Sequence, residues 1–352
     1  MIGAILTTSI VAGAPLGVLA HRAIRRQRAA RTLRIDTPNP IIEEGFVPIG
    51  GIDQWVSVRG EDRHNPVVME IHGGPGASNT IFAPRTRAWE HHFTLARWDM
   101  RGAGKTFGRS GEAGQGELTF ARLMADALEV AEHVRERCGQ PRLILLANSF
   151  GSILGLRLAR DRPDLFSAYV GTDQNVCDAS GEDPGYASAL ERLRRAKRHK
   201  AVAILERMGR DARRWSAEDW RASAKIIAGS DPRIAKVMRE LVVPSLWFSP
   251  QHRLTDIAHF AKGMTFSARL FLEAVHFDAR REGVRFNLPF FIFQGEHDVL
   301  TPVDVAAGFF AEVHAPTKEM AIIPDATHFA SFWRSDEFLD LLLTRVHPRL
   351  PR

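Results

Sequence analysis

The sequence predicts an α/β fold, with a mostly parallel sheet, helices on both of its faces and an inserted helical cap. After residue 40, short apolar runs alternate with helical patterns, the order expected of such a sheet. Runs such as LILLA and PFFIFQ are continuously apolar, as strands buried on both faces are. The alternation stops near Thr172 and resumes near Asn287, and the charged, proline-punctuated segment between them is the predicted cap.

The composition fits one large folded domain that carries an insertion. The chain has 352 residues, of which 45% are hydrophobic and 25% charged. Its net charge of +6 comes from one segment without acidic residues, which contains Arg22, Arg25, Arg26, Arg28, Arg31 and Arg34. The rest of the chain is balanced, which argues against a nucleic-acid-binding surface on the main domain. Cys138 and Cys177 form no zinc or disulfide spacing, so we expect a reducing compartment.

Residues 2–20 carry no charge and approach the roughly 20 residues that cross a bilayer as a helix. Pro15 would kink that helix. The arginines follow the apolar stretch, the reverse of a secretory signal, and the positive-inside rule would keep them cytoplasmic. We therefore expect a cytoplasmic protein whose residues 1–34 tether it to the inner face of the membrane. The alternatives are an apolar helix docked on the body or on a second copy, a weak signal peptide, and a misassigned start.

The remaining elements follow in chain order, as a core over residues 35–172 and 286–352 and a cap over 173–285. We expect an eight-stranded sheet, for which the sequence locates Ile52–Val58, Pro66–His72, Phe93–Asp99, Arg142–Asn148, Ser167–Gly171, Leu288–Gln294 and Met320–Pro324. Apolar residues recur every three or four positions over residues 117–138, which predicts an amphipathic helix there.

Ser149 has the setting of a catalytic nucleophile. It lies between the strand Arg142–Asn148 and the helical run ILGLRLARD, so its hydroxyl would project above the edge of the sheet. Such a sharp turn needs small residues on both sides, here Ala147 and Gly151, although glycine is usual at the first position. The alternative is a serine that only caps the helix.

Asp298 and His328 complete a triad with Ser149 in the chain order Ser, Asp, His. Each follows a predicted strand, in GEHDVLTP and PDATHFASF, so all three lie at one edge of the sheet. His328 would take the proton of Ser149, and Asp298 would orient the imidazole. Neighbouring residues offer alternative assignments: Glu296 or Asp325 for the acid, and His297 for the base.

The glycine-rich loop after the strand VVMEIH predicts an oxyanion hole. Backbone amides of Gly74 and Phe150 are the expected donors, with Gly73 as the alternative to Gly74. Glycine allows the backbone to approach the substrate closely. This chemistry needs no metal and no cofactor, and we expect neither.

Five motifs together resemble the prolyl iminopeptidase branch of the α/β-hydrolases, over roughly residues 45–345. They are HGGPG (residues 72–76), DMRGAGKT (99–106), NSFGS (148–152), GEHDVLTP and PDATHF. The resemblance implies a cap-bearing serine hydrolase without metal, with the triad named above and a structural loop at Asp99 and Arg101. The usual Gly-Gly-Ser-Trp-Gly is replaced by Ala-Asn-Ser-Phe-Gly, and no cap carboxylate lies in a motif that matches.

Substrate contacts are expected from the cap. Its aromatic residues either roof an apolar pocket or form cap core: Trp215, Trp220, Trp247, Phe248, Phe260, Phe266 and Phe271. An aminopeptidase also needs carboxylates for the free ammonium, and Glu182, Asp183, Glu191, Glu273 and Asp278 are available. From these sets the substrate-binding prediction takes Trp247, Phe248, Phe266, Glu182, Glu191 and Glu273.

The expected partner is a short peptide or a small molecule. In the first hypothesis, the protein removes an N-terminal prolyl or small apolar residue. In the second, a carboxylesterase or lactonase acts on a hydrophobic small molecule with the same chemistry. Epoxide hydrolases and dehalogenases need a carboxylate where Ser149 stands. A non-catalytic binding protein is the remote alternative, because it would be free to lose part of the triad.

Overall fold

A single eight-stranded sheet runs through the molecule, whose computed structural model describes residues 2–177 and 180–350, with side chains described from residue 17 onward. The strand order is β1-β2-β4-β3-β5-β6-β7-β8. The pairs β1–β2 and β2–β4 are antiparallel and every other pair is parallel. The predicted mostly parallel, eight-stranded fold is confirmed. The strands are β1 (Ile41–Ile49), β2 (Ile52–Gly60), β3 (Val67–Ile71), β4 (Thr94–Asp99), β5 (Leu143–Asn148), β6 (Phe166–Thr172), β7 (Phe290–Gly295) and β8 (Lys318–Ile323).

Strand β1 is the one that the sequence did not locate. It lies at the edge of the sheet, and only its two end residues are buried, so it lacks the continuous apolar run of the inner strands. A tight turn joins it to β2, with Ile49 paired to Ile52. Both turn residues, Gly50 and Gly51, have positive φ (55° and 77°), as a two-residue hairpin turn of this kind requires.

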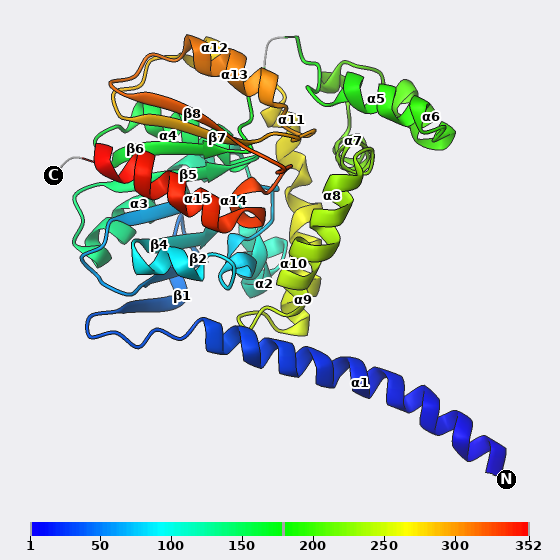
Figure 1. Ribbon diagram of the computed structural model, residues 1–352. Helices are drawn as coiled ribbons and strands as arrows, with labels where there is room; N and C mark the ends of the chain where they lie inside the picture. The colour runs from blue at the N-terminus through cyan, green and yellow to red at the C-terminus, as the bar shows by residue number, and fades with distance from the viewer. Residues whose placement is uncertain (1, 178–179, 351–352) are drawn as a thin grey trace.

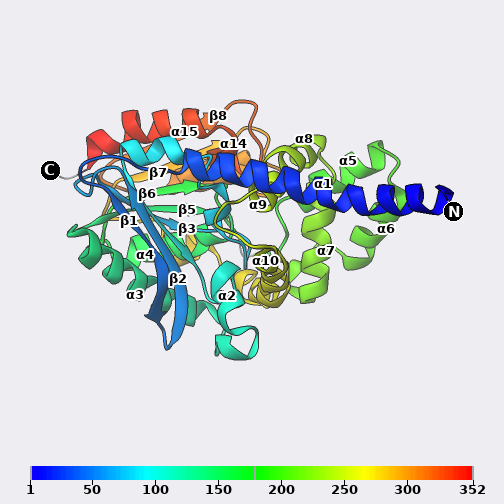
Figure 2. The same cartoon turned by 90° about the horizontal axis from the view of Figure 1, so that it is seen from below.

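Helices cover both faces of the sheet (Figures 1 and 2). The predicted amphipathic helix is α3 (Phe120–Cys138), which packs on one face together with α4 (Gly151–Asp161) and α13 (Val303–Glu312). On the other face, α15 (Ser335–Leu341) buries Phe338 against the inner strands. Two shorter helices complete the core: α2 (Gly104–Ser110) and α14 (Ala330–Trp333).

The predicted cap segment lies between β6 and β7 and is helical. Figure 1 shows α7, α8 and α10 standing beside one end of the sheet, with α5 and α6 beyond them. The helices of this predicted cap segment, called the cap below, are α5 (Tyr186–Arg195), α6 (His199–Met208), α7 (Ala217–Ala228), α8 (Pro232–Val237), α9 (Val243–Trp247), α10 (Leu254–Ser267), α11 (Phe271–Ala274) and α12 (Ala279–Glu282).

The first helix, α1 (Ile2–Thr32), docks on the cap through its arginine-rich end. Arg22 donates to the carbonyl oxygens of Trp247 (2.9 Å) and His252 (3.2 Å). Arg26 donates to those of Ser249 (2.9 Å) and Pro250 (3.0 Å). Arg22 is only 6% exposed, so this part of the arginine run is a packing surface and not a solvated segment.

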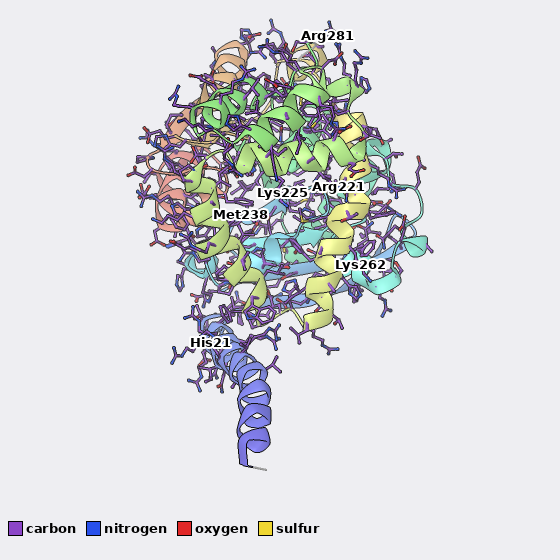
Figure 3. All side chains as sticks on the ribbon, turned by 90° about the vertical axis from the view of Figure 1, so that its right-hand side faces the viewer. His21, Arg221, Lys225, Met238, Lys262 and Arg281 are labelled. Carbon is purple, nitrogen blue, oxygen red and sulfur yellow. The ribbon has the colours of Figure 1, made fainter. Side chains whose placement is uncertain are left out.

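The N-terminal part of α1 leaves the body of the protein, as Figures 1 and 3 show, and His21 marks where the helix reaches it. The predicted apolar segment is residues 2–20, and the side chains of residues 2–16 lie outside those that the structure describes. Within the described part of the chain, no helix combines the length and apolar character needed to cross a bilayer.

Helix α4 packs against β5 at a contact between two small residues. A Cβ atom at Gly155 would lie 2.5 Å from the Cβ of Ala147 and 3.0 Å from the Tyr169 ring. Carbon atoms that are not bonded to each other do not come as close as 2.5 Å, so a methyl group at this position would need a shift of its neighbours. The glycine in α4 therefore makes room for the alanine that replaces the usual glycine before the Ser149 turn.

Replacing Arg22 with alanine should loosen α1 from the cap. We expect Arg22→Ala to lower the free energy of unfolding by about 1–3 kcal/mol, because it removes two hydrogen bonds from a charged, buried donor. Arg28→Ala is the matched control; Arg28 is exposed on the same helix, and its loss should change stability by less than about 0.5 kcal/mol. Urea unfolding measures both variants, and equal effects would contradict the docking role of Arg22.

Gly155→Ala should destabilise the protein even though alanine usually stabilises the interior of a helix by about 0.5–1 kcal/mol. We expect a loss of about 1–3 kcal/mol from overpacking against Ala147. The double variant Ala147→Gly, Gly155→Ala should regain much of this loss, because it removes the closest contact. Thermal unfolding of the single and double variants tests the pair, and purely additive effects would show that the two sites do not interact.

Candidate active site

Ser149 lies on a strained turn between β5 and α4. Its φ is 53°, a conformation that residues other than glycine rarely adopt. The turn is held against its neighbours, since the Ser149 amide donates to the Thr172 carbonyl (3.2 Å). A Cβ at Gly151 would lie 2.4 Å from the carbonyl oxygens of Ile71 and His72, so only glycine fits at that position. The turn therefore exposes the serine hydroxyl at the edge of the sheet, as the sequence predicts.

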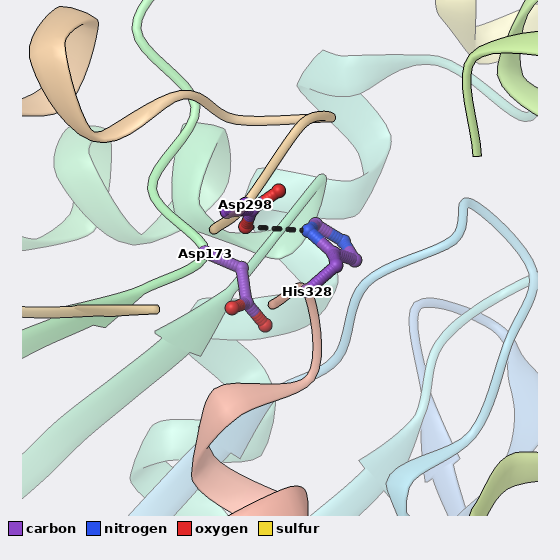
Figure 4. Close-up of side chains that lie close together, drawn as sticks. All are labelled: Asp173, Asp298 and His328. Atoms are coloured by element: carbon purple, nitrogen blue, oxygen red, sulfur yellow. Dashed lines mark hydrogen bonds and ion pairs between the residues drawn. The ribbon is translucent and has the colours of Figure 1, made fainter. Parts of the chain in front are cut away.

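The structure brings Ser149, His328 and Asp298 into one hydrogen-bonded chain. Ser149 Oγ lies 3.0 Å from His328 Nε2, and His328 Nδ1 lies 2.8 Å from Asp298 Oδ2. Figure 4 shows the bond between the histidine and the aspartate. The other Asp298 oxygen accepts from the amides of Leu300 (2.9 Å) and Thr301 (3.0 Å), which fixes the carboxylate. This geometry allows His328 to take a proton from Ser149 while Asp298 holds the ring.

Electrostatics favour the protonated form of His328. Burial alone would lower its pKa, but the charges of Asp298 and Asp173, with the hydrogen bond from Asp298, raise the pKa of His328 to about 9. The site thus stabilises the imidazolium that forms when His328 receives the serine proton.

The three alternative residues do not join this chain. The exposed Glu296 accepts from the Asp325 amide (3.1 Å). His297 lies 3.5 Å from the same Glu296 carboxylate. Glu296, His297 and Asp325 thus interact with one another, outside the hydrogen bonds of Ser149.

The glycine-rich loop is fixed by His72. The His72 Nε2 accepts from the Met100 amide (3.1 Å), so its Nδ1 carries the hydrogen and donates to the Gly73 carbonyl (2.8 Å). Burial lowers the pKa of His72 to about 4, which keeps the ring neutral and suited to both bonds. Gly74, at a φ of 127°, and Phe150 both line the cavity that contains Ser149. The two expected oxyanion donors therefore border the space where a substrate carbonyl would lie.

Each departure from the family motif has a structural counterpart. Gly155 accommodates Ala147. Asn148 accepts a hydrogen bond from Asn79 (3.1 Å). The Phe150 ring packs against Phe120 and Phe271. These contacts explain how the altered motif keeps its turn.

Asp99 and Arg101 lie in buried hydrogen-bond networks. Asp99 accepts from the Ser78 hydroxyl and from the Lys105 amide (2.8 Å). Arg101 forms a buried ion pair with Asp126 (2.9 Å). Both residues thus tie loops to the core, which agrees with the structural role that the resemblance implies.

The cavity beside Ser149 has a volume of about 120 Å³ and is mostly apolar. Helices α7 and α11 of the cap form its roof, with Trp220 and Phe271 stacked 5.1 Å apart. The polar side chains that face it, besides the triad, include Asp183 and Asn175. Its lining consists of Gly74, Ser149, Phe150, Ile153, Asn175, Cys177, Asp183, Trp220, Ser223, Ala224, Ile227, Phe271, Ala274, Val275, Leu300, Thr301 and His328.

The aromatic residues predicted to bind substrate do not line this cavity. The Trp247 ring lies under Arg22, and the Phe248 ring lies against His21 and Arg25, so both rings hold α1. Phe266 is buried between the cap and the core, against Phe107. Trp220 and Phe271 form the roof instead.

The predicted carboxylates also lie elsewhere. Glu182 and Glu191 are exposed, and Glu191 pairs with Arg195. Glu273 accepts from the Phe120 amide (3.0 Å) and so ties α11 to α3. Asp183 faces the cavity in their place, and burial raises the pKa of Asp183 to about 6. Its sequence neighbourhood has no motif, so only the three-dimensional packing singles it out from Glu182.

Two clusters of described residues bring possible metal ligands within 4.8 Å of one another. One consists of Asp173, Asp298 and His328, whose ligand atoms already take part in the hydrogen bonds of the site. The other consists of Glu296, His297 and Asp325 at the surface. We assign no metal to either cluster.

Comparison with known proteins places the chain in a family. The α/β-hydrolase fold family matches residues 66–335. The probable aminopeptidase YbaC of Bacillus subtilis (strain 168) is 24% identical over 288 residues, covering 80% of this chain and 88% of that protein. A proline iminopeptidase of Thermoplasma volcanium is 30% identical over 117 residues, covering 33% of this chain and 37% of that protein.

Among solved structures, 2-hydroxy-6-oxo-6-phenylhexa-2,4-dienoate hydrolase from Rhodococcus sp. strain RHA1 has the same fold. The alignment covers 87% of this chain and 98% of that one, with a TM-score of 0.57 and 18% identity. The family match, the sheet order and the similarity to aminopeptidases agree with the motifs. The chain is a hydrolase that belongs to the α/β-hydrolase fold family and is similar to the prolyl iminopeptidases.

Proposed function

We propose that this protein is a serine hydrolase that works through an acyl-enzyme, with Ser149, His328 and Asp298 as its triad. The observation that carries the proposal is the position of the His328 ring, 3.0 Å from the Ser149 hydroxyl on one side and 2.8 Å from Asp298 on the other. Ser149 also borders a small, mostly apolar cavity of about 120 Å³. A protein that only binds ligands has no use for this arrangement.

In the first half-reaction, Ser149 Oγ attacks the substrate carbonyl carbon and its proton passes to His328 Nε2. The carbonyl π electrons move to oxygen, where the amides of Gly74 and Phe150, or of Gly73 in place of Gly74, would hold the charge. The bond to the leaving group then breaks, and His328 donates the proton to that group. Water repeats the sequence on the acyl-enzyme and releases the acid and free Ser149.

For the substrate we favour a short peptide or amide whose N-terminal residue is prolyl or small and apolar. Residues 173–285 act in this proposal as the cap that encloses that residue. The small apolar cavity suits such a side chain, and Asp183 gives it a carboxylate that could pair with a free ammonium group. The similarity to a probable aminopeptidase and to a proline iminopeptidase points the same way.

The alternative substrate is an ester or lactone of a hydrophobic small molecule. The stacked Trp220 and Phe271 rings favour it, because an apolar roof needs no amine on the substrate. The chain also resembles a putative carbamate hydrolase of Rhizobium rhizogenes (strain K84 / ATCC BAA-868) over 113 residues, at 26% identity.

Turnover of a substrate panel distinguishes these proposals. We expect hydrolysis of prolyl and alanyl arylamides and loss of at least about 1,000-fold in kcat for Ser149→Ala, as removal of a triad member produces. Asp183→Asn should raise KM for the aminoacyl arylamides and leave short acyl esters unaffected, because only the former carry an ammonium group. Glu182→Gln, one residue away and exposed, is the control.

Two results would contradict this account. Turnover of N-acylated or amine-free substrates in preference to aminoacyl ones would select the esterase alternative. Unchanged turnover in Ser149→Ala, for any substrate of the panel, would overturn the mechanism itself.

We also propose that the N-terminal part of α1 attaches the protein to a bilayer from the cytoplasmic side. Residues 2–20 are uncharged, and the helix leaves the body there (Figure 3). Where the side chains are described, Val18, Leu19 and Ile24 are about half exposed, at 54%, 48% and 51%. Further along the helix, Arg25, Arg28 and Arg31 are exposed, as expected near a membrane surface with anionic headgroups.

Deleting residues 2–16 tests this attachment and leaves Arg22 and Arg26 on the cap. We expect the full chain, but not the deletion variant, to sediment with vesicles that contain anionic lipid, because the deletion removes the apolar part of the helix. A full-length protein that stays in the supernatant would contradict the proposal. Light scattering of that soluble protein would then show whether the helix pairs with a second copy instead.

A further inference from the structure

A second aspartate lies beside the triad and has no place in the mechanism above. Asp173 directly follows β6, which lies between β5 and β7, the strands that lead to Ser149 and Asp298. It is fully buried, and its φ of 49° puts it in the left-handed region. Figure 4 shows its carboxylate beside the His328–Asp298 pair. A strained, buried acid at this edge of the sheet calls for a physical reason.

Asp173 holds the backbone that carries the histidine. Its Oδ2 accepts from the Phe329 amide (3.1 Å), and its Oδ1 accepts from the Ala330 amide (3.4 Å). These are the two residues after His328, and Phe329 itself has a positive φ of 71°. The next residue, Gln174, donates its amide to the side chain of Gln294 at the end of β7 (2.9 Å). Asp173 therefore ties the end of β6 to the histidine loop, and Gln174 ties the same segment to the end of β7.

Asp173 also brings a charge to the imidazole. A carboxylate oxygen of Asp173, one of Asp298 and a ring nitrogen of His328 all lie within 4.8 Å of one another. Among the described residues, these two aspartates are the charged groups that shift the pKa of His328. Burial raises the pKa of Asp173, and Asp298 adds to this effect, whereas His328 opposes it. When His328 is protonated, it is thus a cation beside the Asp173 carboxylate.

The two carboxylates differ in how they are satisfied. Asp298 accepts from the amides of Leu300 and Thr301 and from the Thr301 hydroxyl, in addition to His328. Within the described part of the chain, Asp173 accepts from two backbone amides. Asp298 is suited to orient the ring, and Asp173 is suited to anchor the loop and to add negative charge.

We propose that Asp173 is a positioning residue of the triad, which fixes the His328 loop and supplies a second carboxylate that stabilises the imidazolium formed when Ser149 gives up its proton. The inference rests on the proposed serine hydrolase chemistry and on no particular substrate. Its consequence is a more basic His328, so the free enzyme needs a higher pH before the ring is neutral and able to accept a proton.

The test measures how fast a fluorophosphonate probe labels Ser149 as the pH is varied, with the full-length protein. The probe needs no knowledge of the substrate, and labelling requires neutral His328, so the rate rises with pH through the pKa of the ring. We expect the wild-type midpoint to lie above 7.5, at least about one unit over the ordinary histidine value of about 6.5.

Asp173→Asn removes the charge and keeps a side-chain oxygen that can still accept one amide. Asparagine also tolerates the left-handed backbone. We expect its midpoint to fall by about one unit or more, since an opposite charge within about 4–6 Å shifts a pKa by about 1–3 units. The matched control is Asp325→Asn, an exposed aspartate three residues before His328, whose midpoint should equal that of the wild type.

An Asp173→Asn protein that is labelled with an unchanged midpoint would overturn the proposal, as would an equal shift in Asp325→Asn. If Asp173→Asn does not fold, Asp173→Gly takes its place, because glycine also removes the charge and adopts the left-handed backbone freely; the same fall in the midpoint is expected, and an unchanged midpoint would overturn the proposal. A wild-type protein that is not labelled at Ser149 at any pH would instead overturn the proposed function, and this inference with it.

Discussion

The imidazole of His328 is the point on which the rest of the site depends, because its two nitrogens face the Ser149 hydroxyl and the Asp298 carboxylate at once. Those two residues are far apart in the chain and meet only because β5, β6, β7 and β8 are parallel and end at one edge of the sheet. The buried apolar strands of this sheet thus fix the relative positions of the three triad residues. A shift of any one strand would separate atoms that must lie within about 3 Å.

The close packing below Ser149 is the second requirement. The turn at Ser149 is strained, and the close packing around it holds it in place. At Gly151 the backbone of β3 comes so close that no side chain would fit. Gly155 shows how such a site tolerates change, since the alanine before the serine is accommodated by the absence of a side chain one turn into α4. Asp173 also supports the site, because it accepts from the amides of Phe329 and Ala330, the two residues after His328.

Much of the fold could be predicted from the sequence because the inner strands are continuous apolar runs and the triad residues follow them in a fixed order. Strand β1 could not be located in the sequence, because an edge strand with one exposed face has no continuous apolar run. The cavity-lining residues could not be predicted for a different reason. In the sequence, Trp220 and Phe271 are aromatic residues of the cap just as Trp247 and Phe248 are. Only the packing of the cap decides which pair lines the cavity beside Ser149. Likewise, Glu182 and Asp183 are consecutive residues, and only the path of the backbone decides that Asp183 faces the cavity and Glu182 the surface.

Helix α1 shows the same limit of the sequence. Two arginines of its charged run, Arg22 and Arg26, bind carbonyl oxygens of the cap, which also forms the roof of the cavity. The acyl-enzyme on Ser149 is the intermediate that the proposed chemistry requires, and trapping it is the most direct test. After rapid mixing with an activated ester and an acid quench, mass spectrometry should find the acyl group on the peptide that contains Ser149. Product formation without an adduct, or with an adduct on another residue, would contradict the account.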